Sequence, residues 1–268
     1  MTATTTRTLH PHATIGRPIL SARGVTKSFG DTTVLHGVDL DVAEGEFVSV
    51  MGPSGSGKST LLYAISGMDA PTTGTVDVAG TELTTLNRKE LSRLRLTRMG
   101  FVFQQIHLLK NLSLLDNVVL PAHLAGSAPR AELNRRAREL MERTGVGHLA
   151  DHDITQASGG QLQRVGICRA LINQPRILFG DEPTGALDST AAGEIMDILT
   201  ELNNDGTTVL LVTHDPAVAA RTDRLVHLRD GLIEAELHLG RFTPGADPVA
   251  ELRRRQLQVQ DWLARRDL

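Results

Sequence analysis

The chain has 268 residues, of which 40% are hydrophobic and 22% charged, proportions that suit a globular protein with a substantial buried core. A length in this range allows one large domain or two small ones. Aromatic residues make up 3% of the chain and the formal net charge is −3, so neither aromatic stacking platforms nor a basic surface for DNA or RNA is expected. We therefore predict no nucleic-acid partner.

The chain termini and the cysteine usage bear on where the protein works. Residues 1–18 lack hydrophobic periodicity and are predicted to be a disordered tail. The N-terminus lacks the apolar core of a secretory signal, and no apolar run approaches the roughly 20 residues that span a bilayer. The single cysteine, Cys168, cannot form an internal disulfide, which fits a reducing compartment. We expect a cytoplasmic protein whose membrane role would be that of a peripheral partner.

Strand and helix signals follow one another in an order typical of an α/β fold. Residues 20–28 and 34–42 alternate apolar and polar side chains around the turn at Gly30-Asp31, which predicts an antiparallel pair. From about residue 115 to residue 171 the pattern is helical. Further strands are predicted at 47–51, 74–79, 99–103, 176–179, 207–212 and 224–228. This order predicts a parallel, helix-covered sheet interrupted by a mostly helical insertion.

The last part of the chain, residues 238–268, is predicted to be an extension with a terminal helix. Val249, Leu252, Val259 and Leu263 fall roughly on one face of this segment. A packed or solvated helix is the favoured interpretation, and docking on a membrane or a partner is the alternative.

Residues 52–59 have the pattern Gly-x-x-x-x-Gly-Lys-Ser between an apolar strand and a helix-forming run. Such a loop wraps a polyphosphate with backbone N–H groups, and the helix that follows adds the positive end of its dipole. Lys58 supplies a charge for the β- and γ-phosphates, and the Ser59 hydroxyl can ligate Mg²⁺. The predicted nucleotide contacts here are Gly52, Pro53, Ser54, Gly55, Ser56, Gly57, Lys58, Ser59 and Thr60.

Two further strands end in residues suited to nucleotide hydrolysis. Asp181 and Glu182 follow the apolar segment 177–180. Asp181 is expected to hold Mg²⁺, and Glu182 to polarise the attacking water as general base. His214 ends another apolar strand and is expected to sense the γ-phosphate, because ligands bind at this edge of a parallel sheet.

Ser158-Gly159-Gly160-Gln161 predicts a second helix start that could bind an anion. Ser158 and Gln161 have the spacing of a capping box, and the two glycines expose backbone N–H groups in the first turn. A helix start without a ligand is the alternative. A second phosphate-binding helix start makes sense if it closes on nucleotide held by another copy of the chain.

Together these residues resemble the nucleotide-binding domain of ATP-binding cassette (ABC) transporters over about residues 19–237. The resemblance rests on Gly52–Ser59, Gln104, Ser158–Gln161, Asp181-Glu182, Ala186-Leu187-Asp188 and His214. It implies a P-loop NTPase fold with a mainly parallel core sheet, an antiparallel β subdomain and a helical subdomain at about residues 105–175.

The resemblance also implies roles, cofactors and partners. It implies a head-to-tail homodimer that sandwiches two ATP molecules, with Mg²⁺ held by Ser59, Gln104 and Asp181. Lys58, Glu182 and His214 would be the catalytic residues. Gln104 would also couple to an integral membrane permease at the inner face of the cell membrane. Phe29 would stack on adenine, whereas a core phenylalanine in a strand is the alternative.

The motif variants resemble the subgroup that releases lipoproteins, exports macrolides or confers resistance to antimicrobial peptides, which implies export or extraction driven by ATP. A cell-division homologue in this subgroup makes a non-transporting regulator the main alternative. Cassette ATPases that act on chromosomes need a long coiled-coil insertion, and only 123 positions separate Lys58 from Asp181. Ribosome-associated types carry two cassettes, while GTPases and small-molecule kinases do not explain residues 158–161.

Overall fold

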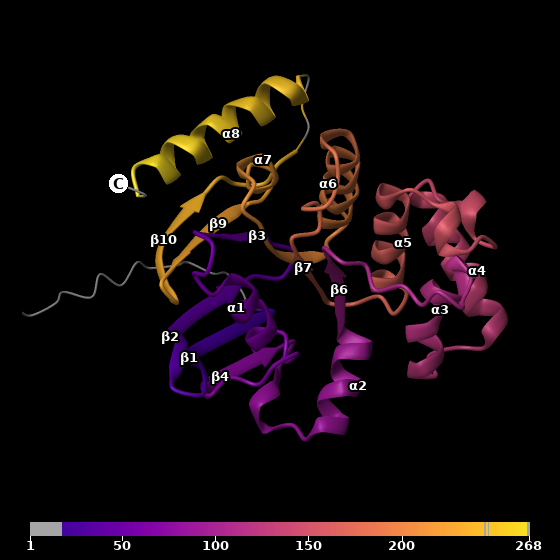
Figure 1. Ribbon diagram of the computed structural model, residues 1–268, viewed down its shortest axis with the longest axis horizontal. Coiled ribbons are helices and arrows are strands. Elements are labelled where there is room, and N and C mark those ends of the chain that lie inside the picture. The colour runs from indigo at the N-terminus through magenta and orange to yellow at the C-terminus, as the bar shows by residue number, and fades with distance from the viewer. Residues whose placement is uncertain (1–17, 244, 246, 267–268) are drawn as a thin grey trace, which may run out of the picture.

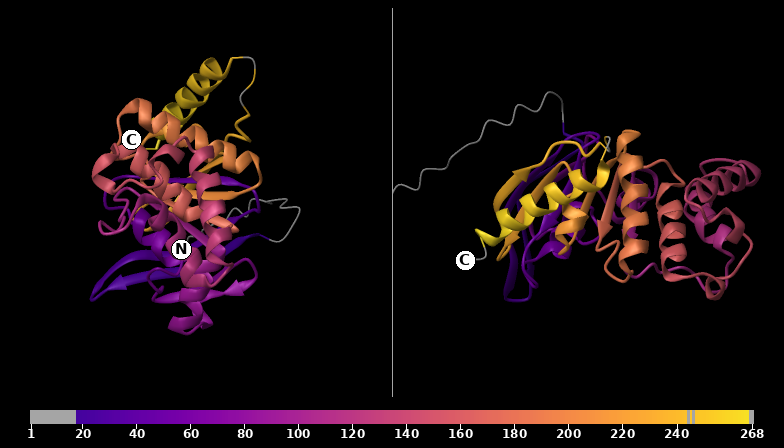
Figure 2. Two further views of the ribbon diagram at one scale, coloured as in Figure 1. Left: turned by 90° about the vertical axis from the view of Figure 1, so that its right-hand side faces the viewer. Right: turned by 90° about the horizontal axis from the view of Figure 1, so that it is seen from above.

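Two β-sheets and a separate group of helices make up the part of the chain that the computed structural model describes, residues 18–243, 245 and 247–266. The sheets lie toward one end of the molecule and helices α3, α4 and α5 toward the other (Figures 1 and 2). The tail predicted for residues 1–18 lies outside the described residues except for its last residue. Within the described part, no helix is both long and apolar enough to cross a membrane.

The larger sheet has the strand order β10-β9-β3-β8-β7-β6. Strands β6, β7, β8, β3 and β9 pair in parallel, and β10 pairs antiparallel with β9. Every residue of β3 and β8 is buried, as expected for strands covered on both faces. The strands are β3 (Phe47–Met51), β6 (Met99–Phe103), β7 (Ile177–Asp181), β8 (Thr208–Val212), β9 (Arg224–Arg229) and β10 (Leu232–His238).

The smaller sheet is antiparallel, with the order β2-β1-β4-β5. Helix α1 (Lys58–Ile65) joins the two sheets, because its buried Leu61 and Leu62 share one apolar cluster with Leu20 of β1 and Val50 of β3. The strands are β1 (Leu20–Phe29), β2 (Thr32–Val42), β4 (Thr73–Val78) and β5 (Thr81–Glu82). The phosphate loop therefore sits between a strand of the larger sheet and a helix that both sheets hold in place.

A second apolar core lies among helices α3 (Leu114–Ala125), α4 (Arg130–Arg143) and α5 (Gly159–Leu171). Val118, Ala137 and Cys168, one from each helix, are fully buried there. Two 3₁₀ turns, η2 (Gly147–Leu149) and η3 (Ile154–Gln156), connect α4 to α5. With the two sheets, this group confirms the predicted fold class.

Helix α2 (Arg88–Arg98) follows the short turn η1 (Leu83–Thr85) and was not predicted from the sequence. No residue of α2 is fully buried, and its contact with the main apolar cluster is made by the partly buried Leu91 and Leu94. The helix begins with a capping box, in which the Asn87 side chain accepts from the Glu90 N–H and the Glu90 carboxylate accepts from the Asn87 N–H.

Helices α6 (Ser189–Asn204), α7 (Pro216–Ala219) and α8 (Pro248–Ala264) complete the described chain. Helix α6 packs its buried Ile195 and Leu199 on Leu211 of β8. Helix α8 crosses α7 at the edge of the larger sheet, so the C-terminal segment covers the end of that sheet opposite α3, α4 and α5 (Figure 1).

Candidate functional site

The phosphate loop folds tightly between β3 and α1. A Cβ at Gly52 would lie 1.9 Å from the carbonyl oxygen of Leu228, so only glycine fits there. Gly57, with φ of 97°, is the N-cap of α1 and turns the chain into the helix. The Nζ of Lys58 donates to the carbonyl oxygens of Gly52 at 2.9 Å and Pro53 at 2.7 Å. These bonds place the ammonium group within the loop.

Strand register brings Asp181 to this loop. Asp181 of β7 is level with Val212 of β8, and Val212 is level with Val50 of β3, near the start of the loop. The Ser59 hydroxyl donates to Oδ1 of Asp181 at 2.9 Å. Two residues that are 122 positions apart in sequence therefore meet at one edge of the sheet.

Glu182 and His214 meet at the same edge. Glu182 has a left-handed backbone, with φ of 49°, and its N–H donates to the carbonyl oxygen of Val212 at 3.1 Å. The Nδ1 atom of His214 lies 2.9 Å from Oε1 of Glu182. The imidazole is largely exposed while the carboxylate is mostly covered, so the histidine stands at the open side of the pair.

Ser59, Gln104, Asp181 and Glu182 line one cavity of about 280 Å³. Its hydroxyl, amide and carboxylate oxygens are the hard ligands that Mg²⁺ prefers, so these residues fit the metal. Burial lowers the pKa of Lys58, and the charges of Glu182 and Asp181 oppose that shift. Among the described residues there is no cluster of three or more His, Cys, Asp or Glu side chains that could hold a metal ion.

The second predicted helix start lies away from this cavity. Helix α5 lies beyond β7 and β6 as seen from α1 (Figure 1), and residues 158–161 do not line the cavity. The capping box itself is confirmed: the Ser158 N–H donates to Gln161 Oε1 at 2.8 Å, and the Gln161 N–H donates to Ser158 Oγ at 3.3 Å. Ser158 and Gly159 are exposed, whereas Gly160 is buried. The helix start is thus formed and accessible from outside this chain.

Phe29 is not a core residue. Its side chain is 53% exposed at the end of β1, and the Lys27 ammonium lies 5.0 Å from the centroid of its ring. The alternative of a buried strand phenylalanine is therefore wrong. An exposed ring at this position is accessible for stacking, as adenine binding requires.

Sequence reasoning missed Gln163, which links α5 to the cavity. Its side chain is 2% exposed, and Nε2 donates to the carbonyl oxygens of Phe103 at 3.1 Å and Pro183 at 2.7 Å. These acceptors adjoin Gln104 and Glu182. The available signal was its position four residues before the buried Ile167, which puts a polar side chain on the inner face of α5.

A family profile described as ABC transporter matches residues 35–185, more than half of the chain. The chain belongs to the ABC transporter family. The geometry agrees with an ABC cassette, since the phosphate loop, Asp181, Glu182 and His214 converge while residues 158–161 do not line their cavity.

Similar proteins and structures include several ABC proteins. The macrolide export ATP-binding/permease protein MacB 1/2 of Paracoccus denitrificans is 46% identical over 240 residues, which cover 88% of this chain and 36% of that protein. The lipoprotein-releasing system ATP-binding protein LolD of Bacteroides fragilis is 44% identical over 216 residues, which cover 80% of this chain and 100% of that protein. The chain thus spans about a third of the length of MacB relatives.

Two solved structures have the same fold as this chain. The dimeric structure of the bacterial ABC transporter cassette MJ0796 superposes with a TM-score of 0.76 at 43% identity, covering 82% of this chain and 98% of that one. A dimeric post-hydrolysis state of the same cassette, bound to ADP and Pi, matches equally well. The chain of 268 residues is therefore an ABC ATPase with the cassette fold.

Proposed function

We propose that this chain is the ATP-binding and ATP-hydrolysing subunit of an ABC transporter that powers export or extraction by a separate membrane subunit. The relative matched over its full length is named as the ATP-binding protein of a lipoprotein-releasing system. The MacB relatives are named for macrolide export. The LolD name supports an ATP-binding subunit of a release system. The MacB name, which joins ATP-binding and permease parts, supports a role in export together with a permease.

The observation that carries the proposal is the separation of the two predicted phosphate-binding helix starts. Lys58, Asp181 and Glu182 gather at one edge of the sheet, while Ser158 is exposed on α5 beyond β7 and β6. Each copy therefore contributes the phosphate loop to one ATP site and the Ser158 helix start to the other. A head-to-tail dimer would bring Ser158 of one copy to the triphosphate held by the other, and the related MJ0796 cassette is dimeric.

In this proposal each half-site has its own task. The phosphate-loop amides and Lys58 bind the β- and γ-phosphates. Ser59, Gln104 and Asp181 would hold Mg²⁺, which supplies charge neutralisation at the phosphate oxygens. Glu182 orients the attacking water and accepts its proton, and His214 holds the Glu182 carboxylate from the open side.

The second copy completes the site for the transition state. The Ser158 hydroxyl and the Gly159 and Gly160 N–H groups would donate to the γ-phosphate oxygens, where charge develops during hydrolysis. Hydrolysis removes the group that both copies share, so the dimer opens. This cycle of closure and opening is the motion that a membrane subunit would follow.

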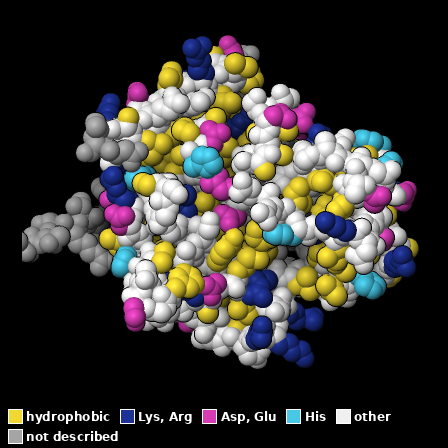
Figure 3. All heavy atoms as spheres, in the orientation of Figure 1, with side chains coloured by type: hydrophobic (Ala, Val, Ile, Leu, Met, Phe, Trp, Pro, Cys, Tyr) yellow, Lys and Arg dark blue, Asp and Glu magenta, His cyan; other side chains and the backbone are white. Residues whose placement is uncertain are grey.

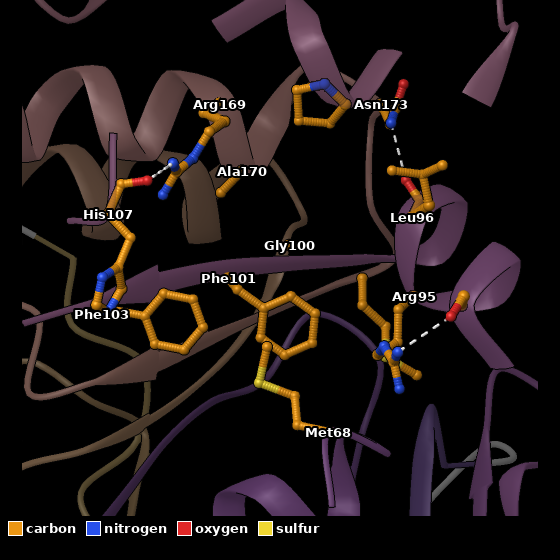
Figure 4. Close-up of a pocket in the computed structure, with 13 residues that line it drawn as sticks. Met68, Arg95, Leu96, Gly100, Phe101, Phe103, His107, Arg169, Ala170 and Asn173 are labelled. Carbon is orange, nitrogen blue, oxygen red and sulfur yellow. Dashed lines mark hydrogen bonds between the residues drawn. The ribbon is translucent and has the colours of Figure 1, made fainter. Parts of the chain in front are cut away.

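An apolar groove beside Gln104 supports docking of the membrane subunit. The groove has a volume of about 410 Å³ and lies among α2, β6 and α5, with the Phe101 and Phe103 rings stacked 6.0 Å apart along its floor. Figure 4 shows Arg95 and Arg169 toward its two ends. In Figure 3 hydrophobic side chains gather on this face above the Lys and Arg side chains of α2. We expect an apolar segment of the permease here, with the chain peripheral on the inner face of the membrane.

The test is a Glu182→Gln variant, which replaces the carboxylate of the proposed base with an amide of the same size. We expect ATP to convert this variant into a stable dimer, measured by size exclusion with light scattering, and its hydrolysis to fall by about 100-fold or more. Glu139→Gln is the matched control, because Glu139 is exposed on α4 and pairs only with Arg135 among the ion pairs seen. A Glu182→Gln protein that stays monomeric in ATP, or hydrolyses it normally, contradicts the proposal.

A further inference from the structure

Two side chains of helix α1 hold the two oxygens of Asp181. The Ser59 hydroxyl donates to Oδ1 at 2.9 Å, and the Tyr63 hydroxyl donates to Oδ2 at 2.6 Å. Ser59 and Tyr63 are four residues apart, so they lie on the same face of the helix. Tyr63 is the single tyrosine of the chain and was not singled out from the sequence.

We propose that Tyr63 is a positioning residue for metal binding, which holds Asp181 by Oδ2 so that Oδ1 stays on the side of Ser59 and Gln104. This inference rests on the proposed function, in which Asp181 serves the metal of the ATP site. A carboxylate at the end of a strand can rotate about its side-chain bonds. A hydrogen bond to the Oδ2 atom of Asp181 prevents that rotation. Hydrogen bonds that hold a metal-binding side chain in place strongly affect metal affinity.

The surroundings of Tyr63 suit this role. The ring packs against the main apolar cluster, and the side chain also lines the cavity that contains Ser59, Gln104 and Asp181. The hydroxyl is thus fixed at the border between the core and the site. Burial and the hydrogen bond to Asp181 raise the pKa of Tyr63 to about 12, so the phenol remains a neutral donor at physiological pH.

Metal binding would affect the Tyr63–Asp181 hydrogen bond differently from the Ser59–Asp181 hydrogen bond. Ser59 is itself a proposed metal ligand, so its hydroxyl oxygen would turn toward the ion when the ion binds. Tyr63 contacts the opposite oxygen of Asp181 and can keep its bond. Tyr63 is therefore the residue able to hold the carboxylate in both situations.

The experiment compares Glu182→Gln with Glu182→Gln/Tyr63→Phe, because the first change suppresses hydrolysis and the second removes one oxygen while keeping the ring. The probe is Mn²⁺ in place of Mg²⁺, titrated with saturating ATP and followed by electron paramagnetic resonance. We expect the Mn²⁺ affinity to fall about 10-fold. The affinity for ATP in EDTA, where no metal is free to bind, should be the same in both variants. A general disturbance of the phosphate loop would instead lower this affinity.

A double-mutant cycle separates positioning of Asp181 from any other effect. The Asp181→Asn change by itself should lower the Mn²⁺ affinity. Adding Tyr63→Phe to Asp181→Asn should then cause no further loss of Mn²⁺ affinity. Unchanged Mn²⁺ affinity in Tyr63→Phe overturns the inference, as does an equal loss in the Asp181→Asn background. If the Glu182→Gln parent binds no Mn²⁺ with ATP, the proposed function fails and the inference fails with it.

Discussion

Glu182 combines an uncommon backbone conformation with a fixed side chain. A left-handed φ costs a residue other than glycine about 1–3 kcal/mol, and such residues gather at functional sites. Here the conformation is stabilised by the N–H bond to Val212 and by the contact with His214. The neighbouring Gly185 leaves room for it, since a Cβ there would lie 3.4 Å from the Cβ of Glu182. The strain is consistent with a carboxylate held ready for one task.

Cys168 is the opposite case, a reactive residue type made inert by its surroundings. It is fully buried in the helical core, 3.1 Å from the Thr144 hydroxyl, and burial raises the pKa of its thiol to about 11. Because the pKa is raised, the folded protein keeps the proton and the reactive thiolate is scarce at pH 8.

We expect iodoacetamide at pH 8 to modify Cys168 at least about 100-fold more slowly in the folded protein than in urea, because the two-unit rise in pKa removes that much thiolate and burial blocks access. Mass spectrometry over time measures the rate. Equal rates in the folded and unfolded protein would contradict the buried position of the thiol.

At the scale of elements, helix α8 is attached to the rest of the chain by the buried Arg255 and by apolar packing around the buried Val259. The Arg255 guanidinium is 2% exposed and donates to the carbonyl oxygens of Ala220 and Thr222, both at 2.7 Å. Ala220 follows α7, the short helix that begins two residues after His214. The Thr222 hydroxyl in turn bonds to Ser49 of β3, the strand that leads to the phosphate loop.

Arg255→Ala should lower the free energy of unfolding by about 2–4 kcal/mol, because it removes charged hydrogen bonds and leaves buried carbonyl oxygens without their donor. Urea unfolding followed by the Trp262 fluorescence of α8 measures the change. Arg254→Ala is the matched control, since the neighbouring Arg254 is exposed and pairs with Glu251 on the same helix. If both variants unfold at the same urea concentration, the buried contacts of Arg255 contribute nothing.

At the scale of the whole molecule, the proposed mechanism depends on a second copy. The described chain brings the phosphate loop, Asp181 and Glu182 together, but α5 starts on the other side of β6 and β7 (Figure 1). Gln163 of α5 nevertheless bonds to the chain beside Gln104 and beside Glu182. The helical group can therefore respond to events in the cavity even though Ser158 does not reach it.

Mixing two inactive variants tests whether sites are shared between copies. Both proteins carry Glu182→Gln. One also carries Lys58→Ala, which removes the lysine that binds the nucleotide, and the other carries Ser158→Arg, which blocks the second helix start. Each protein alone should remain monomeric in ATP. The mixture should form dimers, because one of its two sites combines the intact loop of one copy with the intact Ser158 of the other. Native mass spectrometry distinguishes the pairings, and a mixture that stays monomeric contradicts a shared site.

Features that depend on neighbouring residues could be predicted from the sequence, and features that depend on distant contacts could not. The capping box at Ser158 was predicted because both of its bonds join residues three positions apart. Helix α2 was missed because its contact with the main core is made by two partly buried leucines, Leu91 and Leu94, which are too few to give a sustained apolar period. Tyr63 was missed for a different reason, since its partner Asp181 lies on a remote strand and leaves no pattern in the neighbouring sequence. For Gln163 the sequence indicates an inward-facing polar residue, but not its partners, the remote Phe103 and Pro183.

The sequence by itself determined the phosphate loop, the acidic strand end, the two helix starts and every described strand except β5 and β10, because each depends on residues within a few positions. Only the tertiary structure decided that the loop after β3 meets Asp181 and His214, since that depends on the parallel register of β3, β8 and β7. It also decided that both oxygens of Asp181 are held from α1, and that Phe29 lies exposed. Contacts between distant segments follow from packing, which no short stretch of sequence specifies.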